Sequence, residues 1–461
     1  SLRNRIAAFM KTTNEELWKL GVTAKTQHNE AAPAQHELAP IYMECNVAVD
    51  HNQLIMETLK KVASRQGLHC LLHEKPFAGV NGSGKHDNWS LITDDGKNLF
   101  DPGKTPHENI QFLLLMMCML RAVDKHAALL RESAADPGNE ERLGAAEAPP
   151  AIISIFLGEQ LEDVLEQLVS TGTATHSIKG SVLETGVRTL PDFTKDATDR
   201  NRTSPFAFTG NKWEFRMVGS RDSVGGPNVV LNTIVADALC DACDELEKAE
   251  DFDQAVHDLI KRYAIEHQRI VFSGNGYSQE WVEEAKRRGL PNLPSMVDAI
   301  PALVSEESVR VFEKFGVFRR AELESRMEIK YEAYAKVINI EAKTMIDIAR
   351  KQILPAVMNY TKTVAETVIA VRGAGAEPLV QMEVLTATNN LLKEVKDTLV
   401  HLEEVTEEAG KKAEGCEQAH YYHDEVVPAM KALREPVDHL EMIVSKDMWP
   451  MPSYSDLLFE V

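Results

Sequence analysis

The chain changes character after residues 225–228, which read GGPN, and this change constrains the fold more than any single motif. Before it, short apolar runs suited to strands alternate with helical patterns. After it, nearly every segment from Val229 to about residue 440 has a helical pattern. This order indicates an α+β body followed by a mostly helical C-terminal extension. We expect the body to span residues 1–340 and the helical region to span residues 341–461.

Hydrophobic periodicity also predicts individual elements. Residues 45–66 form a predicted helix, because Leu54, Leu59 and Val62 share one face. The other predicted elements are a helix at 106–132, a strand at 151–158, a polar insertion at 159–200, and a hairpin at 205–218 that turns at Thr209-Gly210-Asn211. In the helical region, Pro355 should end or kink a helix. An apolar stripe through residues 385, 392, 395, 399 and 402 predicts internal packing rather than a partner-binding surface.

The overall charge excludes some classes of partner. The sequence has 50 Lys and Arg against 71 Asp and Glu, a net charge of −21, which argues against nucleic acid and against an anionic membrane surface. The richest apolar run, Phe112–Leu120, is far too short to span a membrane. Six cysteines do not form a disulfide framework in so long a chain, and the CxxC of Cys240 and Cys243 lies within a predicted helix as packing. We therefore expect a cytoplasmic protein.

Two segments carry candidate metal ligands. In EAAPAQHE, Glu30 and Glu37 could converge on a hard cation such as Mg²⁺ or Mn²⁺. In KPFAGVNGSGKHDNWS (residues 75–90), His86 could bind a borderline metal such as Mn²⁺, and Gly82 and Gly84 allow the backbone to approach a ligand closely. Each segment alone has an ordinary alternative. Acidic pairs are common, NGSG is a typical turn, and a single histidine is commonly a hydrogen-bonded structural residue.

Two further segments carry arginines and glutamates. In RLGAAEAPP, Arg142 and Glu147 lie in a loop before a strand, where functional groups are often displayed, although a loop ion pair is the alternative. On the strand KWEFR, alternation places Glu214 and Arg216 on one face, which either lines a polar site or faces solvent. Together the four segments suit phosphoryl transfer from a nucleotide to a carboxylate. A metal-dependent hydrolase fits the same residues equally well.

The order of these segments resembles the glutamine synthetase family. The family pattern is a glutamate, a turn and a second glutamate, then KPF…NGSGxHxNxS, RL…EAP, NRxS and RxExR. Here the corresponding segments read EAAPAQHE, KPFAGVNGSGKHDNWS, RLGAAEAP, NRTS and KWEFR, in the same order over about residues 25–340. NGSGKHDNWS and PGNEERLGAAEAPPAIISIFLG resemble the long-chain, type III branch in particular. The resemblance implies a curved antiparallel sheet that forms a half-barrel active site surrounded by helices.

The resemblance also implies metal and substrate roles. Glu30 and Glu37 match ligands of a first divalent ion beside the glutamate substrate. His86 and Glu214 match ligands of a second ion, which bridges the ATP phosphates. The positions that match the binding site for glutamate itself are Asn81 and Gly82 at its head group and Arg142 at its carboxylate.

The remaining roles concern ATP and the reaction. Asn88 and Ser90 match ATP contacts, and Arg202 matches a residue that contacts ATP and steadies the transferring phosphoryl group, as Arg216 also does. Glu147 matches a mobile-loop glutamate that closes the site and takes a proton from ammonium. The implied reaction forms γ-glutamyl phosphate from glutamate and ATP, and ammonia then displaces phosphate. Two or more Mg²⁺ or Mn²⁺ ions per site and a homo-oligomeric double-ring dodecamer are implied as well.

The sequence departs from the family pattern at several points. Ala34 stands where the family turn has glycine, and Lys212 replaces a family arginine. The second arginine of the NRxSxxR segment is missing at Phe206 and Ala207, which leaves ATP contacts there open. The family's N-terminal β-grasp domain, its paired-glutamate strand and a neighbour-subunit acidic residue have no counterpart in the 461 residues. We therefore expect the parent protein to carry them upstream, and this chain alone to be inactive.

Two alternatives keep the same fold. A γ-glutamylpolyamine-type ligase would change the substrate, but Arg142 and the Asn81-Gly82 pair are placed for an amino-acid head group. A catalytically silent relative would be expected to lose ligands, yet Glu30, Glu37, His86 and Glu214 are all present.

Overall fold

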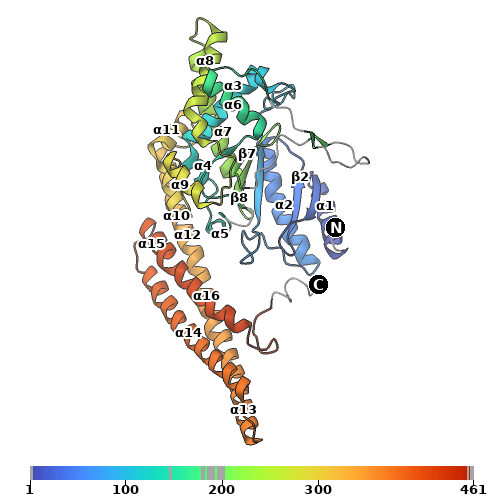
Figure 1. Cartoon of the computed structure of the whole chain (residues 1–461), viewed down its shortest axis with the longest axis vertical. Coiled ribbons are helices and arrows are strands. Elements are labelled where there is room, and N and C mark those ends of the chain that lie inside the picture. Colours follow the sequence, from blue (N-terminus) through green and yellow to red (C-terminus); the bar gives the residue numbers. More distant parts are fainter. Residues whose placement is uncertain are drawn as a thin grey trace. The chain divides into compact units, whose positions relative to one another are not determined.

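The structure is a computed structural model of the chain, and it describes residues 4–144, 148–177, 182–183, 193–194, 203–453 and 456 (Figure 1). The chain divides into two compact units, Ser1–Glu324 and Ser325–Val461. The sequence predicts a catalytic domain at 1–340, with an insertion at 159–200, and a helical region at 341–461. This assignment of domains stays a prediction.

The first unit mixes helices with short strands. Its helices are α1 (Asn4–Lys19), α2 (Cys45–Arg65), α3 (Ile110–Lys125), α4 (Ala127–Glu132), α5 (Pro137–Glu140), α6 (Glu159–Thr171), α7 (Gly225–Leu246), α8 (Phe252–His267), α9 (Gln279–Arg287), α10 (Met296–Ala299) and α11 (Glu306–Lys314). Its strands are β1 (Ala24–Asn29), β2 (His36–Pro40), β3 (Gly84–Trp89), β4 (Ile155–Phe156), β5 (Val182–Leu183), β6 (Phe193–Thr194), β7 (Phe206–Phe208) and β8 (Trp213–Gly219). The predicted α+β class is confirmed.

The largest sheet has four strands in the order β3-β8-β7-β4. β3 and β7 pair with β8 in antiparallel register, as expected. β4 instead pairs with β7 in parallel, with Ile155 opposite Phe206. Parallel neighbours need a long connection, and α6 together with the residues up to β7 provides it. The small sheets β1-β2 and β5-β6 are separate antiparallel pairs.

Most predicted elements of this unit are present. The helix at 45–66 is α2, the hairpin at 205–218 is β7-β8, and Cys240 and Cys243 lie within α7. All six cysteines, each at a described position, are free thiols. The helix predicted at 106–132 is interrupted at His126, which separates α3 from α4. The strand predicted at 151–158 shrinks to β4 because its flanking residues make other pairings, such as the bridge from Ile152 to Asn292.

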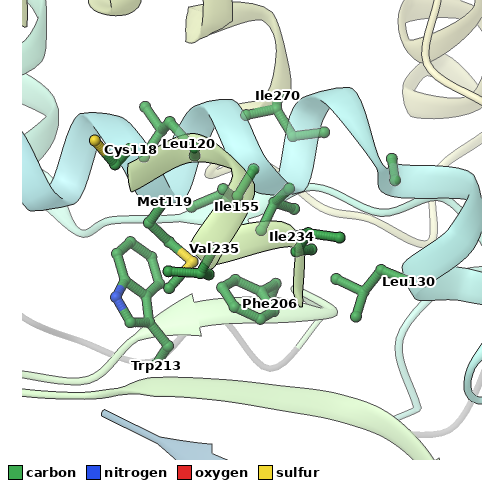
Figure 2. Close-up of a cluster of buried hydrophobic side chains, with 14 of the residues drawn as sticks. Cys118, Met119, Leu120, Leu130, Ile155, Phe206, Trp213, Ile234, Val235 and Ile270 are labelled. Carbon is green, nitrogen blue, oxygen red and sulfur yellow. The ribbon is translucent and has the colours of Figure 1, made fainter. Parts of the chain in front are cut away.

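The main core of the first unit lies between the sheet and the helices. α3 is apolar on most sides, which is typical of a helix that other elements pack around. Its residues Met116, Met117 and Leu120 are fully buried. Figure 2 shows Phe206 and Trp213 projecting from the strands toward Met119 and Val235. The rings of Phe206 and Trp213 stack with their centroids 5.5 Å apart. Among the described residues, no helix, α3 included, is long and apolar enough to cross a membrane.

The second unit is helical. Its helices are α12 (Arg320–Ile348), which begins before the division between the units, α13 (Leu354–Gly373), α14 (Leu379–Ala409), α15 (Cys416–Tyr421) and α16 (Val427–Glu441). α14 packs on α13 and on α16. Val395, Leu399 and Leu402 of the predicted stripe are buried, which supports internal packing.

Two prolines in this unit follow π-helical turns. Ala349–Ile353 forms such a turn directly before Leu354 and Pro355, and Tyr422–Val426 forms another before Pro428. Helical structure therefore continues through Pro355, so the helix does not end there, and the kink that was the other expected outcome stays a prediction. A π-turn changes the local hydrogen-bond spacing, so the proline ring and its missing N–H are accommodated without ending the helix.

Candidate active site

The β1-β2 hairpin displays the first candidate metal ligands. His28 lies opposite Glu37 in the antiparallel register, and Glu30 follows His28 by two residues. Residues two apart in an extended segment share a face, so the three side chains converge. The connecting turn contains Ala34 at φ 55°, the left-handed region that glycine adopts without strain.

These three side chains form a compact cluster. His28 Nε2 lies 2.7 Å from Glu30 Oε1 and 2.8 Å from Glu37 Oε2, and one ligand atom from each residue lies within 4.8 Å of the others. Partial burial and the neighbouring Glu30 carboxylate raise the pKa of Glu37, although the charges of His28 and His86 oppose this. Adjacent carboxylates of this kind are stabilised by a divalent cation, which fits the expected use of Glu30 and Glu37.

His28 is a candidate site residue that reasoning from the sequence missed. Its signal was present, because alternation along a strand places His28 on the same face as Glu30. The imidazole adds a nitrogen to the two carboxylates, and this donor set suits Mn²⁺ as well as Mg²⁺.

The second group of candidate ligands lies where β3 pairs with β8. Asn88 lies opposite Glu214, and a register shift between Lys85 and Asp87 leaves His86 facing two residues of β8. His86 Nδ1 lies 2.8 Å from Glu214 Oε1, and Arg216 Nε donates to the same oxygen at 2.9 Å.

The electrostatics of Glu214 follow from these partners. Burial alone would raise the pKa of Glu214, but the hydrogen bonds and charges of His86 and Arg216 outweigh it and lower the pKa to about 2. Glu214 is 2% exposed and Arg216 is 4% exposed, so this strand face does not meet solvent. This burial contradicts the solvent-facing alternative and is consistent with the wall of a polar site, which stays a prediction.

Gln35 joins the hairpin to the NGSG segment. Its side-chain Nε2 donates to Gly82 O at 2.9 Å and to Ser83 Oγ at 3.1 Å, and its Oε1 accepts from Ala32 N. The charge of His86 also acts on Glu37. The hairpin cluster and the β3-β8 cluster thus belong to one site, and Gln35 is a second residue that the sequence reasoning missed.

The glycines of NGSG make room for Arg142. A Cβ added to Gly84 would lie 2.1 Å from Arg142 Nη2, and one added to Gly82 would lie 2.5 Å from Glu74 O and 2.9 Å from Arg142 Cγ. The Arg142 guanidinium donates to Asn139 Oδ1 at 3.1 Å, to Arg216 O at 3.0 Å and to Met217 O at 3.4 Å. Burial lowers the pKa of Arg142 to about 10, so the group stays charged at neutral pH. The group that the glycines admit in this structure is therefore an arginine of the chain itself.

The predicted ATP contacts, Asn88 and Ser90, lie at the C-terminal end of β3. Asn88 is exposed and its Nδ2 lies 3.4 Å from His86 O, while Asn81 is half-buried. Ser90 Oγ donates to Asn98 Oδ1 at 2.7 Å, and Asn98 Nδ2 donates to Asn211 O in the β7-β8 turn. Two predicted site residues, Glu147 and Arg202, lie outside the described residues.

The site can hold divalent cations and an anionic substrate. The described residues offer three carboxylates, two imidazoles and two buried arginines within the connected region, and this set fits Mg²⁺ or Mn²⁺ together with phosphate. The buried arginines are fixed by hydrogen bonds before any ligand binds, which favours electrostatic stabilisation of a transferring group.

Two family models match the chain. Residues 2–132 match "Glutamine synthetase, catalytic domain", and residues 255–372 match "Glutamine synthetase C-terminal domain".

Curated relatives match over the whole chain. A protein of Dictyostelium discoideum named "Type-3 glutamine synthetase" is 44% identical, and a "Glutamine synthetase" of Butyrivibrio fibrisolvens is 43% identical, each over 100% of this chain. The chain spans 64% and 66% of the length of these two relatives. A solved structure titled "Apo GmaS without ligand" is 20% identical, with 69% of this chain and 59% of that chain covered at a TM-score of 0.41. So low a score supports no inference about substrate.

Proposed function

This chain belongs to the glutamine synthetase family, with type-3 members among its relatives, and we propose that the protein carrying it ligates ammonia to L-glutamate at the expense of ATP. The product is L-glutamine, formed by way of γ-glutamyl phosphate. The observation that carries this proposal is the buried Glu214, held by His86 and Arg216 and joined through the NGSG segment to the Glu30–Glu37 hairpin. This arrangement supplies the metal ligands and fixed positive charge that phosphoryl transfer to a carboxylate needs.

The proposed metal positions use the two clusters. Mg²⁺ or Mn²⁺ at Glu30 and Glu37, and again at His86 and Glu214, would neutralise phosphate charge and polarise the oxygens that react. His28 completes the first of these clusters. Residues outside this chain could add further ligands, because the chain spans about two thirds of its relatives.

The proposed substrate contacts surround these positions. Asn81 and Gly82 hold the amino-acid head group of glutamate, and Arg142 contributes a fixed charge for its carboxylate. Since three contacts of the Arg142 guanidinium already go to protein acceptors, the substrate has to use its remaining N–H groups. Arg216 and Arg202 stabilise the transferring phosphoryl group, and Asn88 and Ser90 contact ATP. Glu147 accepts a proton from ammonium and helps to exclude water from the acyl phosphate.

The test is the dependence of phosphate release on each substrate. With the whole protein, release from ATP should require glutamate, ammonium, and Mg²⁺ or Mn²⁺ together. Glu214→Gln should lower kcat at least about a hundredfold, because it removes a ligand and leaves the His86 and Arg216 donors without their anion. Glu417→Gln, on the surface of α15, is the matched control and should keep full activity.

Two outcomes would overturn the proposal. Release that needs a polyamine in place of ammonium would identify a γ-glutamylpolyamine-type ligase. Absence of both turnover and metal-dependent ATP binding would identify a catalytically silent relative. Retention of activity in Glu214→Gln would refute the assignment of the metal position.

We propose further that the protein works in the cytoplasm as a homo-oligomer, a double-ring dodecamer. The support is the family membership. The mass of the whole protein in solution, measured by light scattering, tests the oligomeric state. A monomer at assay concentration would contradict the dodecamer.

A further inference from the structure

A second acidic cluster lies in the first unit, apart from the hairpin and the β3-β8 ligands. It consists of Glu74 in the segment before NGSG, Asp136 just before α5, and Asp222 just after β8. One oxygen from each carboxylate lies within 4.8 Å of the others. Glu74 is fully buried, and Asp136 and Asp222 are half-buried. The proposed reaction does not use these residues.

One oxygen of Glu74 lacks a donor. Glu74 Oε1 accepts from Arg221 N at 3.0 Å. Glu74 Oε2 is buried without a hydrogen-bond partner in the part of the chain that the structure describes, and its ion-pair distance to Arg221 Nε is 3.6 Å. An ionised carboxylate oxygen that is removed from water without a donor is strongly unfavourable. This oxygen points to a ligand within the cluster.

Two glycines let the backbone lie close against the carboxylates of the cluster. A Cβ added to Gly138 would lie 2.4 Å from Glu74 Oε2 and 3.3 Å from Asp136 Oδ1. A Cβ added to Gly219 would lie 2.8 Å from both Glu74 Oε1 and Asp222 Oδ2. Glycine at both positions lets the backbone of α5 and the end of β8 approach the carboxylates closely.

The positive side chains near the three carboxylates are those of Arg221, Lys85 and Arg142. Arg221 Nη2 lies 2.6 Å from Asp136 Oδ1. Lys85 Nζ donates to the main-chain oxygen of Asp222 rather than to a carboxylate. Burial, together with the charges of Asp136 and Glu74, raises the pKa of Asp222 to about 7, although Arg221 and Lys85 act against this. Repulsion from Asp136 and Glu74 therefore acts on Asp222 even though positive side chains lie nearby.

We propose that Glu74, Asp136 and Asp222 bind a hard, oxygen-liganded metal cation at a site distinct from the catalytic metal positions. Carboxylate oxygens at short mutual distances are the ligands that such cations prefer. The cation supplies the missing partner of Glu74 Oε2 and relieves the repulsion that acts on Asp222. It also fixes the Glu74 main chain, whose oxygen accepts from Ser83 N at 2.7 Å within NGSG.

A surface cavity shares one lining residue, Arg221, with the surroundings of this cluster. It has a volume of about 580 Å³, and its lining includes Met56, Glu57 and Arg221. Arg221 also contacts Asp136 and Glu74, and Met56 Sδ lies 3.2 Å from Lys85 Nζ. Arg221 thus lines the cavity and also contacts two of the carboxylates, and we expect a shift of its side chain to let a cation pass from the cavity to the cluster.

The experiment measures bound Mn²⁺ by electron paramagnetic resonance in the whole protein. The starting variant carries Glu30→Gln, Glu37→Gln and Glu214→Gln, which weakens the proposed catalytic positions. One Mn²⁺ per chain should remain bound in this variant, and adding Asp222→Asn or Asp136→Asn should remove it. Mn²⁺ should also raise the thermal midpoint of the starting variant, and this rise should disappear with either substitution. Glu57→Gln, in the cavity wall, is the matched control and should change neither measurement.

The outcomes separate this site from the proposed reaction, because the starting variant is tested without turnover. Stabilisation by Ca²⁺ or K⁺ in place of Mn²⁺, removed by both aspartate substitutions, also supports a cation site. Mn²⁺ binding that is unchanged by Asp222→Asn and Asp136→Asn overturns the proposal. Failure of Mn²⁺, Ca²⁺ and K⁺ alike to bind or stabilise the starting variant overturns it too, and leaves a shared proton as the occupant. This last measurement stays decisive even if the aspartate variants fail to fold.

Discussion

Replacing Gly84 with alanine should destabilise the protein by displacing Arg142. The added Cβ would lie 2.1 Å from Arg142 Nη2, 2.2 Å from Cζ and 2.6 Å from Nε, so the guanidinium cannot stay in place. Gly84 does not have a left-handed φ, and the backbone itself therefore accepts alanine. The whole effect should come from the contact with Arg142.

The magnitude follows from the hydrogen bonds that the guanidinium loses. Its bonds to Arg216 O and Asn139 Oδ1 are 3.0 and 3.1 Å long, and the guanidinium is buried with Arg142 only 5% exposed. Hydrogen bonds to a charged group contribute roughly 1.5 to 3 kcal/mol each. Losing two of them at the low end gives a fall of about 3 kcal/mol in the free energy of unfolding.

The assay is urea unfolding of four proteins: the unsubstituted protein, Gly84→Ala, Arg142→Ala and the double variant. In the Arg142→Ala background the guanidinium no longer occupies the position next to residue 84, so Gly84→Ala should change the free energy of unfolding by less than about 1 kcal/mol. Gly373→Ala is the control, because a Cβ there meets no atom within 4 Å and the residue is helical. It should be neutral or slightly stabilising.

Two results would refute this reasoning. The first is a loss below about 1 kcal/mol for Gly84→Ala in the parent, since this would mean that Arg142 moves freely. The second is an equal loss with and without the Arg142 side chain, since the effect would then arise elsewhere. A raised KM for glutamate with unchanged stability would place the substrate, rather than Arg142, against Gly84.

Further predictions follow from the same site. The pKa of Glu214 is lowered from 4.5 to about 2, so in metal-free buffer the ionised carboxylate should add up to about 3 kcal/mol to the free energy of unfolding above pH 4.5. This contribution is lost as the pH falls through 2. Glu214→Gln should therefore weaken the dependence of the urea midpoint on pH between about pH 5 and pH 3, and an unchanged dependence would contradict the lowered pKa. Ala34 has φ 55°, so Ala34→Val should lower the unfolding free energy by about 1 kcal/mol or more relative to Ala34→Gly; a valine variant as stable as the glycine variant would argue against the left-handed turn. Gln35→Ala removes the hydrogen bond to Gly82 O, so it should lower the free energy of unfolding by about 1 kcal/mol and raise the KM for the metal ion. Gln418→Ala, in α15 of the second unit, is the control and should leave the KM for the metal ion unchanged.

Local patterns in the sequence were sufficient for the β7-β8 hairpin and for the shared face of Glu214 and Arg216. Alternation fixes which side chains share a face. It does not say which face is buried, so the wall of a polar site and a solvent-facing strand stayed equally good interpretations until the burial of Glu214 was known. That burial depends on segments distant in sequence, which periodicity does not report.

The same distinction applies to Arg142 and His28. The glycines of NGSG were expected to let the backbone approach a ligand, which stays a prediction. The group that lies against them in the structure is Arg142, and its position is decided by the tertiary path of residues 139–142. His28 was missed although alternation placed it beside Glu30, because the motif was taken to begin at Glu30. At Pro355 the expected end of the helix does not occur, because a π-turn precedes the proline and propensity alone does not foresee such a turn.

The π-turns give the second unit a local tolerance to a one-residue change in chain length. A π-turn holds one residue more than the α-helical path it replaces, so the extra residue is absorbed within the turn. Deleting one residue from Tyr422–Val426 should let the helix run on regularly while α16 keeps its orientation relative to α15. A deletion in the regular part of α16, before Leu433, would instead rotate Leu433 and Leu440 by about 100° away from the interior that α16 shares with α14. Homologous chains without the extra residue should therefore keep their apolar residues in phase once a one-residue gap is placed in the turn.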